Sequence, residues 1–104
     1  MIITTTENIP NREIKEIIGI AKGNTVRAKH LGKDFLSGLT GLVGGEMDAY
    51  TDLMDESRNE AIKRMVRHGK VNGADAIVNV RFTTSEIAQG AAEILAYGTA
   101  VKLV

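Results

Sequence analysis

The sequence predicts an α+β fold in which a mixed or antiparallel sheet of about four strands carries one long helix on one of its faces. Three observations lead to this prediction. Segments rich in β-branched residues lie toward both ends of the chain, as is typical of strands. One long amphipathic segment, from about Asp48 to Asn72, lies between them. The 104 residues, of which 43% are hydrophobic, suit a single domain over residues 1–104 with a modest core.

The first strand is expected over Met1–Thr6, a short segment with several β-branched residues. The turn that follows contains Pro10, which cannot lie in a central strand because it has no backbone N–H. The second strand is expected over residues 13–27, either as one long bent strand or as two short strands broken near Gly23-Asn24. A helix over residues 11–21 is the alternative, but Gly19 disfavours it because glycine is costly inside a helix.

The long helix has the strongest signal in the chain. Its apolar side recurs at steps of three and four residues and is formed by Tyr50, Leu53, Met54, Ser57, Ala61, Met65 and His68. Acidic residues gather in its first half and basic residues in its second half, an order that the helix dipole favours. Asn72-Gly73 supplies a stop signal.

Two further strands are expected after the helix, over residues 75–83 and 93–104, with a polar turn over residues 85–91 between them. Because the connection is short, they should pair as an antiparallel hairpin. Strict alternation would place Ala76, Val78, Val80 and Phe82 on one face of the first, and Ile77, Asn79, Arg81 and Thr83 on the other. It would place Leu95, Tyr97, Thr99, Val101 and Leu103 together on one face of the last strand.

One helix can cover only one face of such a sheet. The alternate face of the last two strands carries Ile77 and Ile94 beside three small residues, Ala96, Gly98 and Ala100. We interpret this as the second face of the sheet, apolar and in need of cover. The most economical cover is another copy of the chain, so the expected partner is the protein itself.

Composition excludes several classes of function. Thirteen acidic and thirteen basic residues leave no net positive charge to attract nucleic acid or an anionic membrane. The chain has no cysteine, which excludes disulfides, thiol catalysis, iron–sulfur clusters and thiolate zinc sites. There is no signal-peptide pattern and no apolar stretch of the roughly 20 residues that a membrane span needs. The expected location is therefore the cytoplasm.

The candidate metal ligands are Glu46, Asp48 and Asp52, carboxylates at the start of the long helix. Carboxylates one turn apart can hold a hard divalent cation such as magnesium, calcium or manganese. The structural alternative is that acidic residues at a helix start serve capping and the helix dipole. The two histidines, His30 and His68, match no zinc spacing and are expected to be surface or interface residues.

A glycine-rich run, Ser37–Gly45, precedes these carboxylates and contains four of the chain's eleven glycines. Its spacing fits neither the dinucleotide fingerprint nor the phosphate-binding loop of nucleotide hydrolases. The carboxylates that follow would repel a bound phosphate. We therefore interpret the run chiefly as a packing device near a subunit interface. The sequence offers no nucleophile with a local base, so an enzyme is not the favoured hypothesis.

Four stretches together resemble the YbjQ-like family of small uncharacterised prokaryotic proteins, which are labelled heavy-metal-binding. They are Gly44-Gly45-Glu46, the helix body with Ala61 and Met65, Gly73-Ala74-Asp75-Ala76-Ile77, and Ala96-Tyr97-Gly98-Thr99-Ala100-Val101. The resemblance implies a dodecin-like α+β fold, assembly into a pentameric ring and no established enzyme activity. Because the chain lacks the soft thiolate ligands of heavy metals, Glu46 and its acidic neighbours are the better candidates if a metal binds.

Three hypotheses of function follow. The first is a homo-oligomeric protein that binds a divalent metal ion or a small ligand. The second is a ring that serves as a structural or interaction scaffold without a ligand. The third, less favoured, is an enzyme with active sites between subunits.

Overall fold

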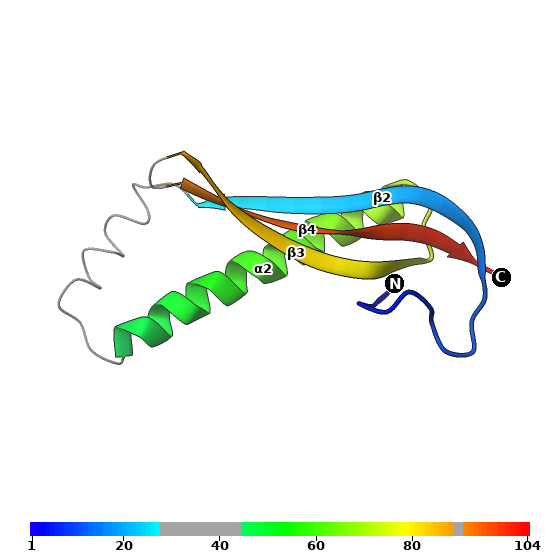
Figure 1. Ribbon diagram of the computed structural model, residues 1–104, viewed down its shortest axis with the longest axis horizontal. Coiled ribbons are helices and arrows are strands. Elements are labelled where there is room, and N and C mark those ends of the chain that lie inside the picture. The colour runs from blue at the N-terminus through cyan, green and yellow to red at the C-terminus, as the bar shows by residue number, and fades with distance from the viewer. Residues whose placement is uncertain (28–44, 89–90) are drawn as a thin grey trace.

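The computed structural model describes residues 1–27, 45–88 and 91–104, and side chains within 1–26, 51–87 and 92–104 (Figure 1). Its elements are β1 (Ile2–Ile3), β2 (Ile14–Arg27), α2 (Gly45–Val71), β3 (Ala76–Ala88) and β4 (Ala91–Leu103). The strands form one sheet in the order β1-β3-β4-β2. The short β1 is parallel to β3, and the other pairs are antiparallel. The predicted α+β class, with a mixed four-stranded sheet and one long helix, is confirmed.

Strand β2 is continuous across Gly23, so the helical alternative over residues 11–21 is wrong. Its pairing with β4 is irregular between Ile14 and Glu16 and between Ile17 and Gly19, rather than near Gly23-Asn24. The first strand is shorter than predicted, because only Ile2 and Ile3 pair with β3 as a strand.

The polar turn predicted over residues 85–91 is also wrong, since β3 continues to Ala88 and β4 begins at Ala91. Ser85 pairs with Glu93 and Glu86 with Ala92. The side chains of Ser85 and Glu86 are exposed on this arm of the hairpin, so polar residues cost the strand little there.

Helix α2 begins at Gly45, slightly before the predicted start, and ends at Val71. The predicted stop is confirmed: Gly73 has φ 85°, and its N–H donates to the Lys70 carbonyl at 3.0 Å. A glycine in this conformation is a common helix end because it has no Cβ to clash. No helix in the described ranges is long and apolar enough to cross a membrane.

The helix covers the face of the sheet that carries the small residues, which corrects the prediction that this face looks away from the helix. Met65 is fully buried there beside Ala61, Ile77, Ile94, Ala96 and Ala100. A methyl group added at Gly23 of β2 would overlap backbone atoms of α2 at Ala61, Arg64 and Met65. The physical reason for the reversal is this close approach, since only small residues let a helix backbone lie so near a strand.

The opposite face, which we call the open face, is covered only at one end. There Ile9 packs with Ala76, Val78, Val101 and Leu103 in a second apolar cluster. The N-terminal segment is fixed across this end by a hydrogen bond from the Arg81 guanidinium to the Thr5 carbonyl at 2.8 Å.

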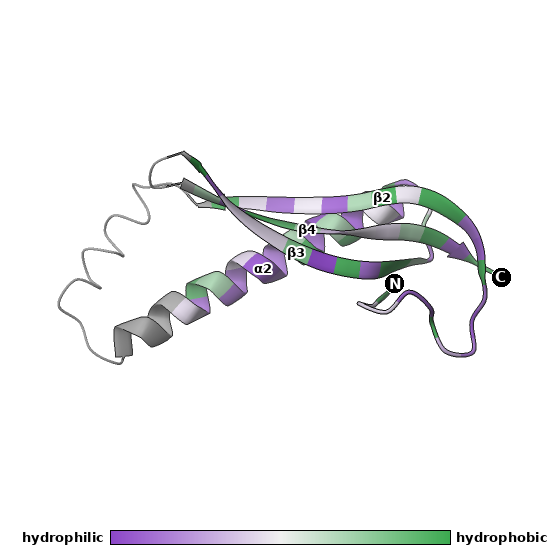
Figure 2. Cartoon of the chain, viewed as in Figure 1, coloured by the Kyte–Doolittle hydropathy of each residue, from purple (hydrophilic) through white to green (hydrophobic). Residues whose placement is uncertain are grey.

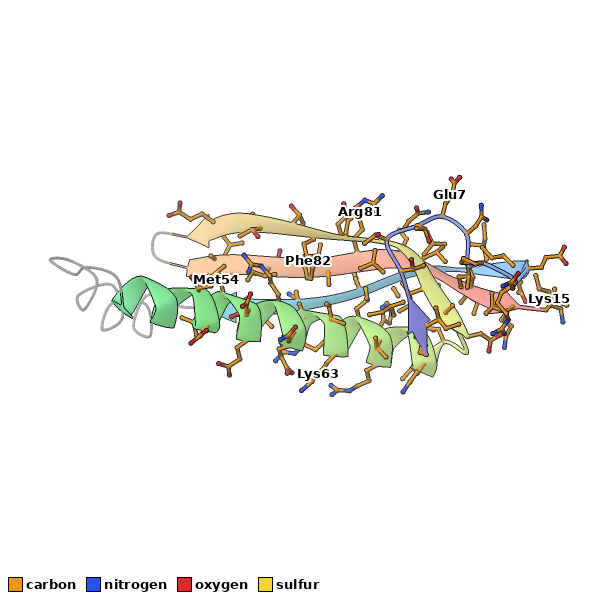
Figure 3. The ribbon with its side chains drawn as sticks, turned by 90° about the horizontal axis from the view of Figure 1, so that it is seen from below. Glu7, Lys15, Met54, Lys63, Arg81 and Phe82 are labelled. Atoms are coloured by element: carbon orange, nitrogen blue, oxygen red, sulfur yellow. The ribbon has the colours of Figure 1, made fainter. Side chains whose placement is uncertain are left out.

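A bulge in β3 changes which of its residues face the helix. Val78 pairs with Thr99 and Arg81 with Tyr97, so β3 has one residue more than β4 in this interval. Asn79 lies in the bulge with φ 54°, in the left-handed region. Val80 therefore packs with Ile77 against the helix, and the prediction that it shares a face with Val78 is wrong. Phe82 lies toward α2, whereas Arg81 lies on the other side of the sheet (Figure 3).

Candidate functional site

The predicted metal ligands lie at the N-terminal end of α2. The backbones of Glu46 and Asp48 belong to its first turn, and their side chains lie outside the described residues. Asp52 follows on the same helix and is exposed. Among the side chains that the structure describes, no three His, Cys, Asp or Glu residues are grouped so that they could hold a metal ion. The glycine-rich run Ser37–Gly45 was predicted to be a packing device, and all of it except Gly45 lies outside the described part of the chain.

A different place gathers polar side chains from several elements. A cleft of about 420 Å³ lies where the edge of β2 meets α2 and β4, and it is lined by Lys22, Asn24, His68, Glu93 and Leu95. Strand β2 contributes the first two residues, α2 the histidine and β4 the last two.

His68 joins the helix to the edge of the sheet. Its Nδ1 atom accepts a hydrogen bond from the backbone N–H of Lys22 at 3.0 Å. Since Nδ1 is the acceptor, the ring proton of the neutral imidazole is on Nε2, which is a donor. His68 was expected to be a surface or interface residue, and it is half-buried at this contact.

Arg64, one turn before His68 on α2, makes a second contact with the same strand edge. Its guanidinium donates to the backbone carbonyl of Asn24 at 2.6 Å and also pairs with Glu60 at 3.3 Å. An edge strand exposes unpaired backbone groups that can pair with other chains. The two helix side chains therefore cap part of this edge.

On the open-face side of the cleft, the side chains of Asn24 and Glu93 are joined by a hydrogen bond. The Asn24 amide donates to Glu93 Oε2 at 2.9 Å, which fixes the carboxylate against the strand. Lys22 and Glu93 take part in neither of the ion pairs found within the described part of the chain, which are Arg58–Asp55 and Arg64–Glu60.

The sequence gives little local signal for this cleft. Lys22 belongs to a stretch with other basic residues, and its relation to His68 depends on how the helix crosses β2. Glu93 meets Asn24 only through the pairing of Asn24 with Leu95 in the register of β2 and β4. The pattern of residues within one segment does not show how that segment pairs with a distant strand.

Comparisons with known proteins extend over the whole chain. Residues 1–104 match the YbjQ family, described as "Putative heavy-metal-binding". The chain is 60% identical over 103 residues to a UPF0145 protein of Archaeoglobus fulgidus, covering 99% of this chain and 95% of that one. It is 56% identical over 104 residues to a UPF0145 protein of Vibrio parahaemolyticus, covering 100% and 99%.

A solved structure supports the fold. It is the crystal structure of a DUF74-family protein of unknown function from Pediococcus pentosaceus, with a TM-score of 0.65 and 18% identity. The match covers 100% of this chain and 98% of that chain. At this identity the likeness bears on the fold alone. The family match and the two relatives together show that this chain belongs to the YbjQ family.

Proposed function

We propose that this protein works as a homo-oligomer, a pentameric ring, that binds a divalent metal ion or small ligand at sites repeated around the ring. The observation that carries the proposal is an apolar patch on the open face, formed by Ile17, Ile20 and Tyr97. Ile17 and Ile20 are 70% and 71% exposed. Hydrophobic residues gathered on a sheet face in this way are typical of an interface between proteins.

The shape of the chain supports assembly. Its radius of gyration is 16.8 Å, against about 13 Å for a compact domain of roughly 100 residues. Figure 2 shows a hydrophobic stretch on the part of β2 that lies near the C-terminus. A second copy would bury side chains that one copy leaves in water.

The sheet also ends in two edges of different kinds, which favours a ring over a symmetric pair. Strand β2 forms one edge, and on the other side β3 extends beyond the two residues of β1. If one edge of a copy meets the other edge of the next, the contact is head-to-tail, and such contacts form a ring when the rotation between copies closes. The number five rests on the resemblance to the family.

The metal ligands that we propose are Glu46, Asp48 and Asp52. A ring repeats the same helix start in every copy, so a few carboxylates from each can supply the six to eight oxygen ligands that calcium takes. Oxygen-preferring ions such as manganese and calcium suit these carboxylates better than thiophilic metals do. The family description supports metal binding without naming a ligand residue.

Two experiments test the proposal. Light scattering coupled to size exclusion should give a mass of about five chains at micromolar concentration. Ile20→Glu should lower that mass, because it places a charge in the open-face patch, while Val71→Glu, at an 80% exposed valine outside the patch, should not. A monomeric wild-type chain would overturn the oligomer.

Calorimetric titration with manganese, calcium, zinc and copper chlorides tests the metal. We expect binding that Glu46→Ala and Asp52→Asn weaken and that the control Asp55→Asn, one turn further along α2, leaves unchanged. An oligomer that binds none of these ions at sub-millimolar concentration would overturn the metal part and favour the scaffold.

A further inference from the structure

We infer that the cleft lined by Lys22, Asn24, His68, Glu93 and Leu95 binds a small zwitterion, specifically an α-amino acid with an apolar side chain. The inference does not use the metal ligands proposed on α2, since none of the five lining residues is among them. It starts from the hydrogen-bonding groups that the fold leaves available in the cleft.

Two hydrogen bonds fix the walls of the cleft, one to a backbone N–H and one to a single carboxylate oxygen. The Lys22 backbone N–H, rather than the ammonium group, is bonded to His68 Nδ1 at 3.0 Å. On the other wall, only Oε2 of Glu93 receives the Asn24 amide. Groups that are held before a ligand arrives lose less conformational entropy on binding.

Among the described residues, three polar groups of the cleft then remain for a ligand. The Lys22 ammonium and the Nε2–H of His68 are donors that suit a carboxylate, and Oε1 of Glu93 is an acceptor that suits an ammonium group. The cleft thus has one cation and one anion, whose opposite charges match those of an amino acid. Leu95 adds an apolar contact for the side chain.

The same groups disfavour other ligands. A metal ion at His68 would need an unprotonated ring nitrogen, but Nδ1 is engaged with the strand and Nε2 carries the proton. The Lys22 ammonium would repel the ion as well. A simple anion would bind close to the Glu93 carboxylate and meet its repulsion. The volume of about 420 Å³ lies within the range of small-molecule sites, about 300–1,000 Å³.

The test is a titration of the ¹⁵N-labelled full chain with L-leucine, followed by NMR. Saturable shifts are expected at the backbone amides of Lys22, Asn24 and Glu93. Two analogues of the same shape provide the comparison: 4-methylpentanoate lacks the ammonium group, and 3-methylbutylamine lacks the carboxylate. Each should bind at least tenfold more weakly, because it leaves one charge of the cleft unpaired.

Two variants remove the charges and keep the walls. Lys22→Gln leaves the backbone N–H that His68 accepts, and Glu93→Gln keeps a carbonyl oxygen for the Asn24 amide. Each should weaken L-leucine binding at least tenfold, whereas Lys15→Gln, on the same strand outside the cleft, should not.

Any one of three results would overturn the inference. The first is no saturable shift up to about 10 mM L-leucine, and the second is that both charge variants bind L-leucine as tightly as the wild-type chain does. The third is that 4-methylpentanoate binds as tightly as L-leucine. None of these bears on the mass of the oligomer, so this inference and the proposed ring fail separately.

Discussion

The Nδ1 atom of His68 accepts the backbone N–H of Lys22 at 3.0 Å, which ties the last two turns of α2 to the edge of the sheet. The two residues are 46 positions apart in the sequence. With the Arg64 guanidinium on the Asn24 carbonyl, this contact gives β2 a partner on the side where no strand pairs with it.

Replacing His68 by leucine should lower the free energy of unfolding by about 1 kcal/mol, because the Lys22 N–H loses its acceptor at a half-buried contact. His68→Gln, which retains an acceptor oxygen, should lose less. Urea denaturation at one fixed protein concentration measures both, since the stability of an oligomer depends on concentration. Equal losses for the two variants would show that the hydrogen bond contributes nothing.

Gly23→Ala should destabilise the fold by about 3 kcal/mol, because the added methyl group meets the backbone of α2 at Ala61 and Met65. Backbone atoms cannot rotate out of the way as a side chain does. Lys15→Ala on the same strand, where the side chain is exposed, should change stability by less than about 0.5 kcal/mol. A Gly23→Ala variant as stable as wild type would contradict the close contact between strand and helix.

Met65→Ala should cost about 3 kcal/mol, since Met65 is fully buried among Ala61, Ile77 and Ala96 and its loss opens a cavity. Met54→Ala, on the same helix but only partly buried, should cost clearly less. Thermal unfolding of both variants beside wild type gives the comparison. A larger loss at Met54 would contradict the placement of the core beneath the second half of α2.

Asn79→Val should destabilise by about 1–2 kcal/mol, because a β-branched residue is strained at φ 54°. Asn79→Gly should be tolerated, since glycine adopts this conformation readily. The difference between the two midpoints of guanidinium unfolding isolates the backbone strain. If valine and glycine behave alike, the bulge is not held in the left-handed conformation.

Local sequence patterns predicted the helix and strands of this fold better than they predicted which face of the sheet the helix covers. The helix, β2 and the β3–β4 hairpin follow from periodicity and short connections within single segments. In β4, however, both Leu95 and Ala96 belong to apolar sides, so alternation alone does not say which side the helix covers. The glycine at position 23 decides it, through a contact with a helix about 40 residues away.

The bulge at Asn79 explains the second wrong prediction about the faces of the sheet. Strict alternation puts Val78 and Val80 together, and one extra residue separates them. The signal in the sequence is an asparagine within an apolar, β-branched run, since asparagine tolerates positive φ better than its neighbours do.

The candidate sites also differ in how far the sequence could predict them. Glu46, Asp48 and Asp52 follow from their spacing, and as metal ligands they stay predictions. The cleft around His68 and Glu93 depends on three elements meeting, which spacing within any one of them does not record.

The extra residue in β3 has a consequence for insertions and deletions in this strand. If Asn79 were deleted, Val80 would lie opposite Gly98, and every residue from Val80 onward would keep its side of the sheet. A deletion a few positions later, at Thr83 for example, would turn the rest of the strand over, exchanging its inward and outward side chains. Asn79 is thus a position in β3 at which the chain can be shortened by one residue without exchanging the two sides of the hairpin.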